Sequence, residues 1–94
     1  IVYGTDNLFP AWPNPARAGQ EVTVSWFFQE PAEAMLELLD VRGRVVADWL
    51  PMQSFASGHH QRSFTLSSLN SGTYFYRLTQ ADGTARSHVV QVVD

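Results

Sequence analysis

Three histidines are the side chains in this sequence best suited to hold a metal ion. His59 and His60 are neighbours, and His88 lies near the end of the chain. Imidazole is a common zinc ligand, but adjacent residues of a strand point to opposite faces of a sheet. His59 and His60 therefore cannot easily reach one ion, and the absence of cysteine removes thiolate ligands. We expect no metal site and no cofactor.

Glu33 and Glu37 are the second candidate, because many glycosidases place two carboxyl groups on either side of the bond that they cleave. On a strand, four residues separate the two side chains by about 13 Å, which exceeds the spacing in retaining and inverting enzymes. The sequence also contains no nucleophile-elbow motif and no glycine-rich phosphate loop. We expect Glu33 and Glu37 to face water and the chain not to be an enzyme.

Aromatic side chains are candidates for stacking on sugar rings. Aromatic residues make up 13% of the chain, and the side chains that could be partly exposed are Trp12, Phe27, Trp49 and Phe55. Half-buried aromatics are also common in small domains. A carbohydrate-binding module therefore stays an alternative function, as does a structural spacer or assembly module.

The charge and length of the chain restrict the remaining possibilities. The net charge is -3 and the charged residues are interspersed, so we expect no nucleic-acid partner. No apolar run approaches the ~18 residues that a membrane helix needs, so we expect no membrane insertion. The 94 residues, 45% of them hydrophobic, predict one domain with a modest core and no disulfide. Because the chain begins at Ile1 rather than Met, we expect it to be part of a longer polypeptide.

Short strands separated by turns must position these side chains. Residues 21–28 alternate strictly, and further strands are expected at 44–50, 59–66, 73–80 and 84–93. A loop is expected at 51–58, a corner at 67–71 and an Asp-Gly hairpin turn at 81–83. Residues 1–12, interrupted by Gly4 and Pro10, suit a lead-in segment or linker with a possible edge strand. The domain itself is expected over residues 13–94.

The secondary structure of residues 31–39 is ambiguous between helix and strand, because a proline is followed by strong helix formers. The sequence Asp40-Val41-Arg42-Gly43, however, is a good type I turn that leads directly into the next apolar segment. Because a hairpin needs a strand on each side, we expect a strand with Ala34, Leu36 and Leu38 facing inward. About seven strands then predict an all-β fold, an immunoglobulin-like antiparallel β-sandwich.

Leu69, Gly72 and Tyr74 have the spacing of the tyrosine corner of immunoglobulin-like sandwiches. In such a corner, a tyrosine near the start of the sixth strand hydrogen-bonds to the backbone just upstream. Tyr76 then holds the inward position two residues later. We expect these residues to be structural.

Three stretches follow one another along the chain and read PNPARAGQEVTV at 13–24, LLDVRGRVV at 38–46 and LNSGTYFYRL at 69–78. Together they resemble the type A C-terminal sorting domain of the type IX secretion system (Por secretion system) of Bacteroidetes-like bacteria. FlgD-like immunoglobulin modules carry nearly the same motifs. The motif positions are Pro13, Asn14, Pro15, Asp40, Gly43, Arg44, Leu69, Gly72 and Tyr74.

This resemblance implies a non-catalytic β-sandwich at the end of a larger secreted protein, often a hydrolase, for which it serves as an export address. The outer-membrane secretion and attachment machinery would recognise the domain. The upstream cargo would pass through the periplasm and be secreted or attached to the cell surface. The sequence departs from the family's usual basic tail at residues 91–94, which read QVVD.

Overall fold

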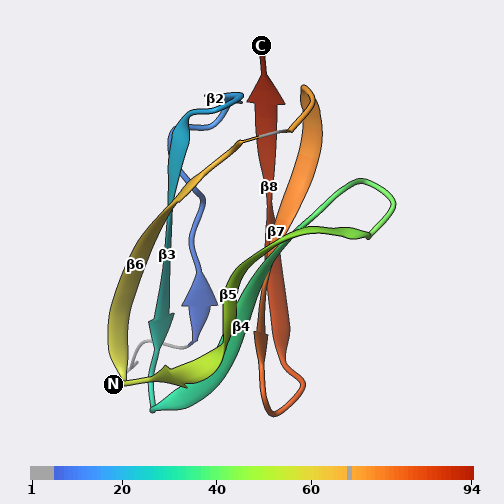
Figure 1. The fold of residues 1–94 in the computed structure, drawn as a ribbon. Helices are drawn as coiled ribbons and strands as arrows, with labels where there is room; N and C mark the ends of the chain where they lie inside the picture. Colours follow the sequence, from blue (N-terminus) through green and yellow to red (C-terminus); the bar gives the residue numbers. More distant parts are fainter. Residues whose placement is uncertain (1–5, 68) are drawn as a thin grey trace.

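A computed structural model describes residues 6–67 and 69–94, and all of its regular elements are β-strands in two packed sheets (Figure 1). Residues 1–5 of the lead-in segment and Ser68 of the corner expected at 67–71 lie outside the described residues. The strands are β1 (Asn7–Leu8), β2 (Ala16–Arg17), β3 (Glu21–Phe28), β4 (Ala32–Leu39), β5 (Val45–Phe55), β6 (Gly58–Thr65), β7 (Gly72–Gln80) and β8 (Ala85–Val93).

The two sheets have the arrangement of an immunoglobulin-like sandwich. Sheet A has the order β1-β3-β6 and sheet B the order β2-β8-β7-β4-β5. All strand pairs are antiparallel except the two-residue β2, which runs parallel to β8. The expected fold class is confirmed, with eight described strands because two short ones precede β3.

The ambiguous segment is a strand, as predicted. β4 pairs with β5 on one side and β7 on the other, so its backbone donors and acceptors are used in the sheet. Ala34, Leu36 and Leu38 are fully buried against the opposite sheet. Pairing and burial on this scale override a helix preference of a few tenths of a kcal/mol per residue.

The predicted loop at 51–58 is wrong, because β5 continues to Phe55 and only residues 56 and 57 separate it from β6. Pro51 lies on an edge strand, at a register shift between the pairs Leu36–Leu50 and Ala34–Gln53. Edge strands and irregular pairings tolerate proline, since its missing N–H is not needed there. The proline therefore marks a bulge in β5 rather than the end of the strand.

The expectation that Glu37 faces water is also wrong. Its residue is only 8% exposed, and its Oε1 accepts a hydrogen bond of 3.0 Å from Nη2 of Arg77, which lies opposite it on β7. Burying a carboxylate is costly unless it is paired and hydrogen-bonded, and Arg77 supplies that partner. Glu33 is exposed, as expected.

Aromatic side chains fill the space between the sheets. Trp26 of β3 is fully buried and meets Phe55 edge to face at 5.5 Å. Trp49 of β5 stacks on Phe64 of β6, with ring centroids 4.5 Å apart. Tyr76 of β7 is fully buried, and its hydroxyl donates a 2.8 Å hydrogen bond to the carbonyl of Phe9. These contacts join β5 to β6 and β7 to the segment that follows β1.

Candidate functional site: motif turns and two sheet faces

The turn after β4 is organised by the carboxylate of Asp40. Its Oδ1 accepts hydrogen bonds from the backbone N–H groups of Arg42 and Arg44, at 2.9 and 3.0 Å, and its Oδ2 accepts one from Nε of Arg44 at 2.9 Å. The hydrogen bond from the backbone N–H of Arg44 is the main reason that the pKa of Asp40 lies below its usual value; desolvation opposes it, and the Arg44 guanidinium group and the backbone N–H of Arg42 add to the lowering. Gly43 has a φ of 81°, a conformation that L-residues rarely adopt. Asp40, Gly43 and Arg44 thus close one turn together.

The side chain of Asn14 pairs with the edge of β8. Its Nδ2 donates to the carbonyl of Val89 at 3.1 Å, and its Oδ1 accepts from the backbone N–H of Gln91 at 2.9 Å. The peptide bonds before Pro13 and Pro15 are both cis. From Ala16 onward, β2 continues the pairing along β8. The Pro-Asn-Pro segment and β2 therefore cover an edge that would otherwise expose backbone donors and acceptors.

Tyr74 has the geometry of a tyrosine corner. Its hydroxyl donates a 2.8 Å hydrogen bond to the carbonyl of Asn70, four residues upstream. Leu69 is half-buried and packs against the core, and Gly72 begins β7. The three positions lie at the same end of sheet B.

The structure divides the four aromatic residues considered for sugar stacking. Phe55, only 5% exposed, and Trp49 belong to the packing between the sheets, which corrects the expectation that Phe55 could be partly exposed. Phe55 is buried because β5 continues through the expected loop and pairs Phe55 with Ala32 of β4. Trp12, 48% exposed, and the half-buried Phe27 lie instead on the outer face of sheet A.

The three histidines do not converge. His59 is exposed on the outer face of sheet A, whereas His60 points inward, close to the Phe55 ring at 5.1 Å. A ring nitrogen of His88 lies 2.7 Å from the carbonyl of Leu8. Within residues 6–67 and 69–94 no group of three or more His, Cys, Asp or Glu side chains is placed to hold a metal ion.

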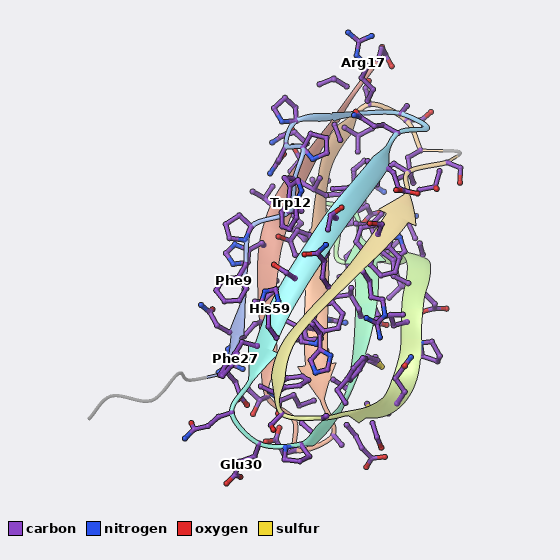
Figure 2. The ribbon with its side chains drawn as sticks, turned by 90° about the vertical axis from the view of Figure 1, so that its left-hand side faces the viewer. Phe9, Trp12, Arg17, Phe27, Glu30 and His59 are labelled. Atoms are coloured by element: carbon purple, nitrogen blue, oxygen red, sulfur yellow. The ribbon has the colours of Figure 1, made fainter. Side chains whose placement is uncertain are left out.

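The outer face of sheet A carries a group that we call the aromatic face, made of Phe9, Trp12, Phe27 and His59. Figure 2 shows these residues beside one another along β1 and β3. Phe9 was not singled out from the sequence, and His59 was considered there only as a metal ligand. The sequence carries no clear signal for Phe9, because β1 spans only Asn7–Leu8 and is too short to show a period.

The outer face of sheet B carries a different group, which we call the apolar row. Cross-strand pairing aligns Val45, Leu39, Phe75 and Val89 across β5, β4, β7 and β8. Leu39 is buried beneath its neighbours, whereas the other three are exposed. An apolar hollow of about 240 Å³ adjoins the row, between Phe75 and the turn that contains Asp40 and Gly43. The aromatic face and the apolar row thus lie on opposite surfaces of the sandwich.

The fold defines a class, the immunoglobulin-like β-sandwich, and the comparison with known families then assigns the chain within it. A family model described as a secretion system C-terminal sorting domain matches residues 10–92. The chain therefore belongs to the type IX secretion C-terminal sorting domain family. Such a domain is a non-catalytic module of a larger cargo protein and implies interaction with the type IX secretion machinery.

Other comparisons bear on the fold alone. No curated protein matches the sequence. A solved structure of Pseudomonas fluorescens alkylpurine DNA glycosylase AlkC, bound to DNA containing an abasic site analog, is similar with a TM-score of 0.61 and 13% sequence identity. The match covers 94% of this chain and 29% of AlkC, so this chain spans less than a third of that protein. No helix in the described residues is long and apolar enough to cross a membrane.

Proposed function

We propose that this chain is the export address of a larger secreted protein, a hydrolase, and that it directs this cargo across the outer membrane to the cell surface or the medium. The observation that carries the proposal is the family match, which extends over residues 10–92. In this proposal residues 13–94 form the sorting domain, and residues 1–12 connect it to the upstream cargo. The domain itself is not catalytic.

The motif residues, in our proposal, act mainly by holding the fold. Asp40 accepts three hydrogen bonds within its own turn, Asn14 pairs with β8, and the Tyr74 hydroxyl is bonded to backbone. Side chains engaged in this way have little hydrogen-bonding capacity left for a receptor. The surface that the machinery recognises therefore lies beside the motif residues and is supported by them.

We propose that this surface is the apolar row. Interface cores are depleted in charged residues and enriched in aromatic ones, and exposed apolar patches mark interaction sites. The row offers Phe75 and two exposed valines. The Asp40 turn borders it at one end of β4, and Asn14 is bonded to the backbone of Val89 in the row. The motif positions thus support the apolar surface from two sides.

The test is an export assay. The chain is fused behind a periplasm-directed reporter in a bacterium with a working type IX system, and the reporter is measured in the periplasm, on the surface and in the medium. We expect export by the unaltered chain, and a loss of at least about tenfold for Phe75→Ser. Trp12→Ser, on the opposite sheet, is the matched control and should be exported normally.

Two results would contradict the proposal at different levels. A reporter that stays in the periplasm with the unaltered chain, even when the native end of the protein is restored, would refute the sorting function. Normal export of Phe75→Ser would refute only the role of the apolar row. Circular dichroism of each purified variant establishes that the comparison is made between folded proteins.

A further inference from the structure

The aromatic face gathers ring side chains from β3 and from the segment that follows β1. Phe27 lies opposite Asn7, the N–H of Phe9 bonds to the carbonyl of Ser25 at 3.0 Å, and Trp12 lies opposite Thr23. The rings of Phe27, Phe9 and Trp12 therefore follow β3 in steps of two residues, which correspond to about 7 Å each.

A fourth ring closes the gap between the strands. His59 of β6 pairs with Phe27 across β3, and its ring centroid lies 5.8 Å from that of Phe9. Ser25, which lies on the same face of β3 between these residues, is only 4% exposed. Phe9 and His59 are thus in contact, and Trp12 and Phe27 flank them along the same side of sheet A (Figure 2).

Between the levels of Phe27 and Thr23, the polar groups beside the rings are hydroxyls and an amide, and the carboxylate of Glu21 lies one step further along β3. The register places Thr23 opposite Ser63 and Ser25 opposite Gln61, and the hydroxyls of Thr23 and Ser63 lie 3.0 Å apart. Each hydroxyl can both donate and accept a hydrogen bond, and the amide of Gln61 does both as well. From the level of Phe27 to that of Thr23, the paired positions of β3 and β6 on this face carry no Asp, Glu or Arg.

The outer face of sheet B differs from the aromatic face in its charged residues, which bear on the class of ligand. Next to the apolar row, sheet B presents Glu37 and Arg77 as an ion pair, with Asp48 paired to Glu37 on β5. Protein interfaces are depleted in serine at their cores, whereas the aromatic face interleaves its rings with Ser25, Ser63 and Thr23. The hydroxyl and amide groups of the aromatic face, with no Asp, Glu or Arg at the paired positions on this face between Phe27 and Thr23, therefore complement an uncharged ligand rich in hydroxyl groups.

We infer that the aromatic face binds an uncharged polysaccharide. The rings of Trp12, Phe9 and Phe27 would stack on the C–H faces of successive sugars, and Gln61, Ser63 and Thr23 would hydrogen-bond to the sugar hydroxyls. The inference goes beyond the sorting function and does not depend on it, because binding is measured on the isolated chain and export on the fused reporter.

The experiment measures retention of the 94-residue chain on three insoluble uncharged polymers, cellulose, chitin and xylan. We expect retention on at least one of them. An aromatic contact contributes about 0.5–1.5 kcal/mol beyond its area, so Trp12→Ala and Phe27→Ala should each weaken binding by about two- to twelvefold. Phe75→Ala, with a side chain 37% exposed on the opposite sheet, is the matched control and should bind as the unaltered chain does.

Salt dependence gives a second readout. Because the ligand is uncharged, the affinity should change little between low and high sodium chloride concentrations. Lack of retention on all three polymers, an equal loss in Phe75→Ala, or strong salt dependence would each overturn the inference. So would sedimentation showing a dimer that Trp12→Ala dissociates, since the face would then be an interface between two copies of this chain.

Discussion

Tyr76 connects the two sheets through one buried hydroxyl, and Tyr76→Phe removes that group alone. The side chain is fully buried, and the hydroxyl donates a 2.8 Å hydrogen bond to the carbonyl of Phe9. Without the donor, this carbonyl loses its partner inside the protein. An unsatisfied buried polar group costs about 1–3 kcal/mol, so we expect the free energy of unfolding at neutral pH to fall by that amount.

The same burial predicts how the difference depends on pH. Desolvation raises the pKa of Tyr76 from 10.0 to about 12, because the folded protein disfavours the phenolate. The unfolded chain therefore releases this proton at lower pH than the folded chain does. The contribution of Tyr76 to stability is fully present below about pH 10 and is lost as the pH rises toward 12. A shift of two pKa units corresponds to a loss of at most about 2.7 kcal/mol in the free energy of unfolding.

Urea unfolding followed by tryptophan fluorescence measures both effects. For a small domain, a loss of about 2 kcal/mol shifts the midpoint by roughly 1–2 M urea. The stability difference between the unaltered chain and Tyr76→Phe should shrink between about pH 9 and pH 11.5, because only the former contains the titrating phenol. Tyr74→Phe retains Tyr76 and should therefore keep this decline. A difference that stays constant over this range would refute the reasoning.

Local sequence patterns predicted the parts of the fold that depend on neighbouring residues. The alternation of Val22, Val24, Trp26 and Phe28 placed β3 within its observed bounds, since every second side chain enters the core. The residues that form β4 have a composition typical of a helix, but the turn that begins at Asp40 correctly predicted a strand. That turn closes through its own side chain, so its signal is complete within a few residues.

The errors fall where the outcome depends on residues far apart in the sequence. Glu37 is buried because Arg77, 40 residues away, lies opposite it. Phe55 is buried because β5 continues through the expected loop and pairs it with Ala32 of β4. The aromatic face could be predicted only in part, since Phe9 and His59 are brought together by two separate pairings with β3. Alternation within one segment contains no information on either pairing.

Substitutions at two further positions, Asn14 and Gly43, test how the motif residues support the fold. Asn14→Ala removes both hydrogen bonds to the edge of β8, so we expect the free energy of unfolding in urea to fall by about 1–2 kcal/mol. The uncovered edge should also promote aggregation, measured as increased light scattering. Asn7→Ala, at another exposed asparagine, is the control, and equal effects of the two substitutions would contradict the edge-covering role of Asn14. Gly43→Ala introduces a Cβ that would meet no atom within 4 Å, at a φ of 81°, so its cost is backbone strain alone, about 1–2 kcal/mol. Because asparagine adopts this conformation more readily than alanine, Gly43→Asn should cost less by the same measurement. If the two substitutions at Gly43 were equally destabilising, the turn would require glycine for a reason other than its backbone angle.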